Sequence, residues 1–103
     1  MEKYKRDGKV AVLYSPGFGA GWSTWNDDGE SLMFDSRIVE KVLNDKRHEI
    51  TQEFMESLGY GYCYCGGAGE LTIAWVGEGE QFVIDEYDGS ESVELTYNIC
   101  NTA

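Results

Sequence analysis

The chain has 103 residues, of which 42% are hydrophobic and 14% aromatic. This composition excludes a disordered chain and is typical of a globular protein with one hydrophobic core, so we predict a single domain over residues 1–103. No apolar run approaches the roughly 18 residues of a membrane helix, and no apolar signal core follows the charged first residues. With an odd number of cysteines, three, the chain is expected to work in a reducing cytoplasm.

The net charge of −11 is unevenly distributed along the chain. All 8 Lys and Arg residues lie in the first 47 positions, together with 8 of the 19 acidic residues. Residues 48–103 carry the other 11 acidic residues and no Lys or Arg. We expect this half to project a negative potential, which disfavours direct nucleic-acid binding and favours a basic protein partner. The simpler interpretation is that the charge only keeps the protein soluble.

In chain order, the first predicted element is a strand over 9–15, which is rich in β-branched and aromatic residues and ends at Pro-Gly. A glycine-rich loop follows, and residues 30–34 are predicted to form a short second strand. A helix is expected through about residue 46, with its N-cap at position 35 or 36. A second helix is expected over 49–58. The apolar stripe of the first helix consists of Ile38, Val39, Val42 and Leu43.

The second half of the chain predicts strands. Residues 59–70 form an irregular segment, and from residue 71 the hydrophobic period changes to two. A short Gly-Glu turn predicts that strands 71–76 and 81–87 pair as a hairpin, and an Asp-Gly turn then leads into a third strand over 92–99. We therefore predict an α+β fold: a small two-layer domain whose antiparallel sheet contains a C-terminal three-stranded meander, with two helices on one face.

The stretch SPGFGAGWSTWN, residues 15–26, raises the question of a phosphate-binding loop. Its glycines form G-x-G-x-G, whereas dinucleotide sites use G-x-G-x-x-G leading directly into a helix, and no lysine lies near. We expect the loop to shape a surface rather than to cradle phosphate. Trp22 and Trp25, beside Asn26, are suited to stacking on a base or anchoring a protein interface, or one or both rings close the end of the core.

The cysteines and the single histidine offer two further kinds of chemistry. Cys63 and Cys65, with Cys100 and His48, contain the donor types of a zinc site, but the C-x-C spacing is not that of a zinc knuckle and favours buried free thiols, so no metal is expected. The sequence contains neither a G-x-S-x-G motif nor a Cys/His signature in which the single histidine could activate a nucleophile, so an enzyme is not expected.

The run IDEYDGSESVE, residues 84–94, is rich in carboxylates. Paired carboxylates can perform general acid–base chemistry or hold a hard cation, but the EF-hand pattern is not matched. A turn followed by a solvated strand face explains the same residues. We expect that this face supplies negative charge through Asp85, Glu86, Asp88, Glu91 and Glu94.

Two stretches, VLYSPGFGAGWSTWN (12–26) and GGAGELTIAWVGEGEQFVIDEYDGSESVE (66–94), resemble a family of short hypothetical proteins of tailed phages and prophages. The resemblance spans nearly the whole chain, with residues 36–58 less distinctive. It implies a phage accessory protein that acts in the cytoplasm of a bacterial host, and it transfers no catalytic residue. It also implies that residues 22–26 and 87–91 belong to one functional surface.

Small acidic phage proteins, many anti-CRISPR proteins among them, occupy basic surfaces of host nucleic-acid enzymes. We therefore predict a non-enzymatic inhibitor of a host defence system, without a cofactor, that binds a basic protein. The alternative is a small-ligand binding protein such as a cyclic-nucleotide sponge, which would be expected to form a homo-oligomer to enclose its pocket. Virion components and enzymes are lesser alternatives. The predicted partner-binding residues are Trp22, Trp25, Asn26, Asp85, Glu86, Asp88, Glu91 and Glu94.

Overall fold

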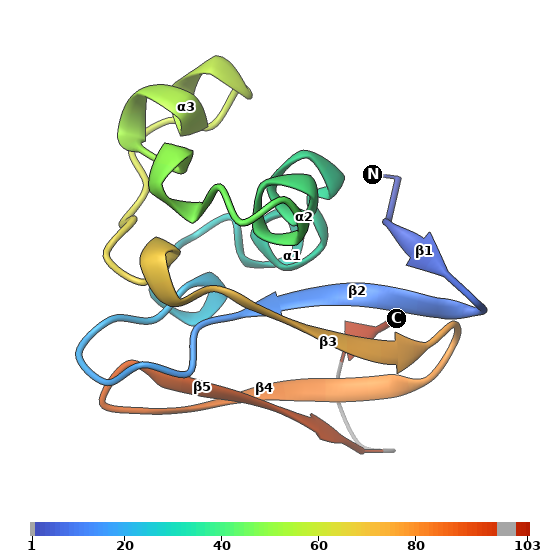
Figure 1. Cartoon of the computed structure of the whole chain (residues 1–103). Coiled ribbons are helices and arrows are strands. Elements are labelled where there is room, and N and C mark those ends of the chain that lie inside the picture. The colour runs from blue at the N-terminus through green and yellow to red at the C-terminus, as the bar shows by residue number, and fades with distance from the viewer. Residues whose placement is uncertain (1, 97–100) are drawn as a thin grey trace.

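A computed structural model describes residues 2–96 and 101–103. It shows the predicted α+β fold, but in three layers: helices lie above a central sheet, and a second sheet lies below it (Figure 1). The helices are α1 (Gly29–Phe34), α2 (Ser36–Leu43) and α3 (Gln52–Ser57). The central sheet has the order β1 (Lys5–Arg6), β2 (Lys9–Tyr14), β3 (Thr72–Gly77). The second sheet has the order β5 (Ser90–Leu95), β4 (Gln81–Tyr87), β6 (Asn101–Thr102).

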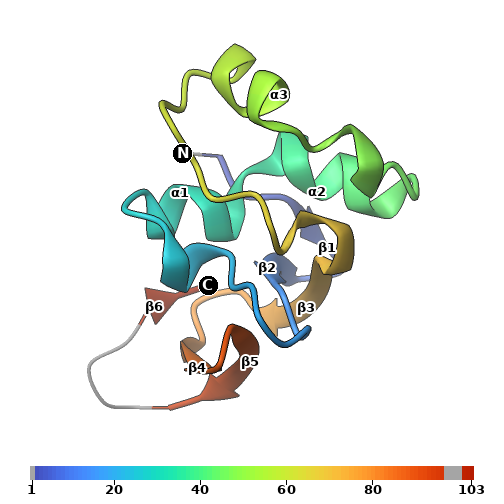
Figure 2. The ribbon, with the colours of Figure 1, turned by 90° about the vertical axis from the view of Figure 1, so that its left-hand side faces the viewer.

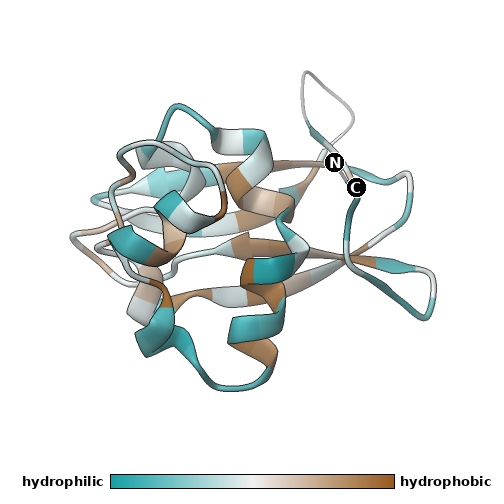
Figure 3. Ribbon diagram, turned by 90° about the horizontal axis from the view of Figure 1, so that it is seen from above, coloured by the Kyte–Doolittle hydropathy of each residue, from teal (hydrophilic) through white to brown (hydrophobic). Residues whose placement is uncertain are grey.

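Strand β2 is the centre of the molecule. Its residues Val10 to Leu13 are all fully buried, because alternate side chains of a strand point to opposite faces and both faces of β2 are covered. Ala11 and Leu13 belong to the core under the helices, whereas Val10 and Val12 belong to the core between the two sheets. Seen from the helical side, hydrophobic residues follow the strands, and hydrophilic residues mark the outer helical turns (Figure 3).

Strand β3 does not form the predicted hairpin with β4. It pairs antiparallel with β2 along its whole length, from Lys9 opposite Gly77 to Tyr14 opposite Thr72. The two alternating faces of β3 are both needed for packing: Ile73 and Trp75 contact the core under the helices, and Val76 lies in the core between the sheets. The predicted three-stranded meander is therefore wrong. The turn after β3 instead carries the chain from one sheet to the other.

The second predicted hairpin is confirmed. Strands β4 and β5 pair antiparallel through the Asp88-Gly89 turn, with Tyr87 opposite Ser90. Gly89 has a φ of +83°, and a Cβ atom there would lie 2.3 Å from the backbone nitrogen of Ala20, so glycine is required. The predicted third strand extended to residue 99, but residues 97–100 lie outside the described residues.

Residues 30–34 form helix α1 rather than the predicted strand. Leu32, Met33 and Phe34 are all buried, because Leu32 packs in the core under the helices whereas Met33 and Phe34 pack in the core that contains Val10 and Val12. A run of three apolar residues does not distinguish a buried helix from a buried strand. The backbone carbonyl of Leu32 accepts a hydrogen bond of 2.9 Å from the Trp22 indole, which ties α1 to the glycine-rich loop.

The two helices predicted from periodicity are confirmed, although both are shorter than predicted. Asp35 is the N-cap of α2, and its side chain accepts a hydrogen bond from the backbone N–H of Arg37. Thr51 caps α3 in the same way through the N–H of Phe54. Gly59, with a φ of +98°, follows the end of α3. None of the helices in residues 2–96 has the length and apolar character that crossing a membrane requires.

Candidate protein-binding surface

Three segments that are far apart in the sequence lie together at one end of the molecule, which we call the loop end: residues 15–28, 59–66 and 87–91 (Figure 2). The backbone N–H of Gly19 donates a 2.6 Å hydrogen bond to the carbonyl of Asp88. The N–H of Tyr64 donates to the Asn26 side chain at 2.7 Å. The glycine-rich loop is therefore bonded to both of the other segments.

The glycine-rich loop does bind an anion, but the anion is the carboxylate of Glu91. Its oxygens accept hydrogen bonds from three backbone N–H groups, at distances of 2.8–3.0 Å, and a fourth bond from the Thr24 hydroxyl. The backbone N–H of Glu91 in turn donates to the carbonyl of Ser15 at 2.7 Å. The three N–H donors belong to Ser15, Trp22 and Thr24. These groups, which a bound phosphate would have used, already have a partner.

The expectation that Glu91 supplies surface charge is wrong. Only 2% of the residue is exposed, because it lies opposite Glu86 on the face of β5 that the glycine-rich loop covers. Trp22 also does not reach the surface. Its ring is fully buried in the core under the helices, and its indole N–H has an internal acceptor, so Trp22 closes the core.

Trp25 and Asn26 do lie at the surface of the loop end. Trp25 is 38% exposed, and its ring centroid lies 5.1 Å from that of Tyr64. The Asn26 amide is half-buried and donates to the carbonyls of Trp22, at 2.8 Å, and Tyr64, at 3.1 Å. Asn26 thus holds the segment around Tyr64 against the glycine-rich loop.

Three further aromatic residues of the loop-end segments are exposed, and none of them was among the predicted partner-binding residues, although Tyr87 lies in the turn that the resemblance placed on the functional surface. Phe18 is 76% exposed, Tyr62 86% and Tyr87 73%. Phe18 and Tyr62 stand in loops next to glycine, and Tyr87 is the last residue of β4, directly before the Asp88-Gly89 turn. These positions next to glycine or a turn were the available signal. Exposed aromatic rings gathered at one end of a small protein are typical of a binding surface.

The acidic residues of the β4–β5 hairpin lie beside the loop end. Asp85 pairs with Ser92, and Glu94 pairs with Val83, so Asp85 and Glu94 share the face of the hairpin that points away from the central sheet. Glu86 and Asp88 are exposed as well, and the Glu86 carboxylate accepts a 2.9 Å hydrogen bond from the N–H of Gly89.

These four hairpin carboxylates are not neutralised by the basic first half of the chain. In the part of the chain that the structure describes, none of them forms an ion pair with Lys or Arg. By contrast, Glu78 pairs with Lys5, and Glu49 pairs with Lys41. The predicted negative surface therefore survives folding on the hairpin, although it is reduced elsewhere.

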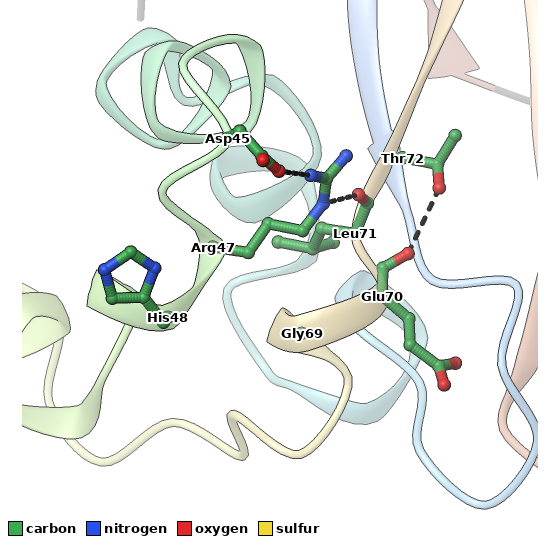
Figure 4. A pocket seen from close by; sticks show the side chains of 7 residues that line it. All are labelled: Asp45, Arg47, His48, Gly69, Glu70, Leu71 and Thr72. Carbon is green, nitrogen blue, oxygen red and sulfur yellow. Dashed lines mark hydrogen bonds and ion pairs between the residues drawn. The ribbon is translucent and has the colours of Figure 1, made fainter.

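A separate polar depression of about 530 Å³ lies between the segment after α2 and the start of β3 (Figure 4). Arg47 lines this depression, and its guanidinium already has two partners in the protein. Its Nε donates to the Leu71 carbonyl at 2.7 Å, and its Nη1 lies 3.1 Å from the Asp45 carboxylate. The ring of His48 points away from Arg47. The Thr72 hydroxyl, which also lines the depression, donates a hydrogen bond of 3.1 Å to the carbonyl of Glu70.

Cys63 and Cys65, two of the candidate metal ligands, are free thiols. Cys63 is buried and Cys65 is half-buried, and burial raises the pKa of both thiols, which keeps them protonated at neutral pH. Within residues 2–96 and 101–103, no group of three or more His, Cys, Asp or Glu side chains is placed to hold a metal ion. Cys100 lies outside the described residues.

Comparisons with protein-family models, with curated proteins and with solved structures find no match.

Proposed function

We propose that the protein is a non-enzymatic binding protein that occupies a basic surface of another protein. In the role implied by the sequence resemblance, it acts in the cytoplasm of a bacterial host as a phage inhibitor of a defence enzyme. The observation that carries the proposal is the group of exposed hairpin carboxylates Asp85, Glu86, Asp88 and Glu94. They lie beside exposed aromatic rings and, among the residues that the structure describes, form no ion pair with Lys or Arg.

The carboxylates and the aromatic rings of this surface contribute to binding in different ways. Carboxylates steer a cation-rich partner and speed its encounter, but charges at the rim of an interface add little affinity. Aromatic rings supply affinity when they become buried, since Tyr and Trp are the side chains most often found as hot spots. Tyr87 stands between the acidic residues Glu86 and Asp88, so the hairpin carries both kinds of group.

The surface is also held rigidly, which lowers the entropic cost of binding. The hydrogen bonds of Glu91 fix the glycine-rich loop to β5, and the Ser90 hydroxyl donates to the carbonyl of Pro16 at 2.7 Å. The same bonds disfavour a cyclic-nucleotide pocket in this loop, because its inward N–H groups are occupied and Trp22 is buried.

The proposal is tested by capture from a bacterial host lysate, followed by measurements on the purified partner. The protein is immobilised and compared with the triple variant D85N/D88N/E94Q at about 50 mM and about 300 mM NaCl, a range over which screening strengthens greatly. We expect a nucleic-acid-binding protein that the wild type retains only at low salt and that the triple variant loses. Labelled DNA or RNA, followed by fluorescence anisotropy, should then be displaced from that partner by the wild type.

The matched control is E53Q/E56Q, which removes exposed negative charge from α3 instead of from the hairpin. Equal capture by the wild type and the triple variant would contradict the proposal, as would a partner whose nucleic acid is not displaced. In cells with an active defence system, expression of the wild type should raise the plaquing efficiency of a targeted phage. Expression of the triple variant should not.

A further inference from the structure

A groove of about 280 Å³ opens at the loop end between the glycine-rich loop and the segment that follows α3. The aromatic residues Trp25, Tyr62 and Tyr64 line it, and Asp27 and Asp28 line it as well. No Lys or Arg is among its lining residues. It combines two features that attract a cation: ring faces, which carry negative potential, and carboxylates.

The groove is formed before any ligand arrives. The rings of Trp25 and Tyr64 lie 5.1 Å apart at an interplanar angle of 51°, so they form two inclined walls rather than a closed stack. The Asn26 side chain makes two hydrogen bonds that join the two segments, one to the carbonyl and one from the N–H of Tyr64, and a third within its own loop to the carbonyl of Trp22. A preformed groove of this kind avoids the cost of ordering loops on binding.

The carboxylates at the groove are available to a ligand. Asp27 and Asp28 are both exposed, and in the described ranges neither forms an ion pair. Tyr62 is 86% exposed and leaves most of its ring uncovered. A planar guanidinium suits these groups better than a compact ammonium, because it stacks on aromatic faces and bonds a carboxylate through two parallel N–H groups.

We propose that this groove receives an arginine side chain of the protein partner. This inference rests on the proposed function and deepens it, because it replaces a general attraction to basic protein with one recognised side chain at one place. The acidic hairpin then brings the partner close, and the aromatic groove determines where it docks.

The test uses NMR titration of the wild-type protein with N-acetyl-arginine-N-methylamide and with the corresponding lysine compound. The reporters are the indole N–H signals, since Trp25 lines the groove whereas Trp22 is buried elsewhere in the core. We expect the arginine compound to shift the Trp25 signal saturably, with the Trp22 signal unchanged and the lysine compound binding at least about threefold more weakly. Shifts that do not saturate, or equal binding of the two compounds, would overturn the inference.

Variants locate the site. Y62A should weaken arginine binding about two- to fivefold, as expected for loss of an exposed cation–π contact. D27N/D28N should weaken it further. The control variant E40Q removes an exposed carboxylate from α2 and should bind the arginine compound as the wild type does. If E40Q weakens arginine binding as much as Y62A and D27N/D28N, the groove is not the site.

The outcomes separate this inference from the proposed function. If a basic partner is captured and D27N/D28N and Y62A bind it as the wild type does, the inference fails and the proposed function stands. If the arginine compound saturates the groove but no basic partner is captured, the proposed function fails and the groove remains an arginine site.

Discussion

Glu91 illustrates how much of this molecule depends on a single side chain. It is a carboxylate with four hydrogen-bond donors around it, and none of them is a cation. Three of the bonds converge on Oε2 and one on Oε1. Hydrogen bonds to a charged acceptor are stronger than those between neutral groups, and a donor left buried without an acceptor is costly. Glu91 therefore determines where the glycine-rich loop lies.

At this residue we predict that E91A lowers the free energy of unfolding by about 3–5 kcal/mol, because it leaves several donors without an acceptor. E91Q should cost less, since its amide oxygen can still take the three bonds at Oε2. Urea unfolding followed by tryptophan fluorescence measures both. D85N, on the exposed face of the same hairpin, is the control and should stay within about 0.5 kcal/mol of the wild type. A loss below about 1 kcal/mol in E91A would show that the loop holds without Glu91.

At the scale of elements, the start of α2 is joined to the end of α3 through Asp35. This carboxylate is buried and caps α2. It accepts hydrogen bonds from the Arg37 guanidinium, at 2.7 and 3.0 Å, and from the Tyr60 hydroxyl, at 2.8 Å. Burial acts to raise the pKa of Asp35, but the hydrogen bonds from Arg37 and Tyr60 outweigh it and hold the pKa below the ordinary value of 3.8.

The sign of the pH dependence follows from that lowered pKa. The stabilisation by ionised Asp35 is complete above the unfolded-state pKa, near 3.8, and is lost as the pH falls through the lower folded-state pKa. We predict that D35N is less stable at pH 7 by about 1–3 kcal/mol and loses less stability than the wild type between about pH 5 and pH 2. E40Q, an exposed change on the same helix, should keep the wild-type pH profile. Parallel profiles for wild type and D35N would contradict this role.

At the scale of the whole molecule, the net charge of −11 lowers the stability of the folded state and favours binding to a basic partner. Unpaired carboxylates on the hairpin and loops repel one another in the compact state, and salt screens that repulsion. The same salt screens attraction to a basic partner. Stability and binding should therefore respond to salt in opposite directions.

We predict that raising NaCl from about 10 mM to about 150 mM, which shortens the Debye length from about 30 Å to about 8 Å, raises the melting temperature. Each kcal/mol of relieved repulsion corresponds to about 4–8 °C for a domain of this size. Scanning calorimetry measures the shift, and D85N/E94Q should show a smaller one. A melting temperature that falls with salt would mean that the ion pairs Lys5–Glu78 and Lys41–Glu49 matter more than the repulsion.

Local patterns in the sequence determined much of this protein without any knowledge of the fold. Strand β2, helices α2 and α3 and the Asp-Gly hairpin were predictable, because each depends on residues close together in the chain. The excess of acid in the second half was also readable from the sequence. Of the predicted surface residues, Trp25, Asn26, Asp85, Glu86, Asp88 and Glu94 do lie at least partly exposed.

Only the tertiary structure decided which partners these elements have. Alternation shows that both faces of β3 carry apolar residues, but it does not show that β2, some 60 positions earlier, is the neighbouring strand. Residues 30–34 form a helix whose buried side chains reach both cores, which the apolar run alone does not indicate. Glu91 and Trp22 were among the predicted partner-binding residues, yet both are buried. The donors that surround Glu91 lie 67–76 positions away in the chain, and only folding brings them together. The sequence shows which polar groups need a hydrogen-bond partner when they are buried, and the tertiary structure determines which partner each of them has.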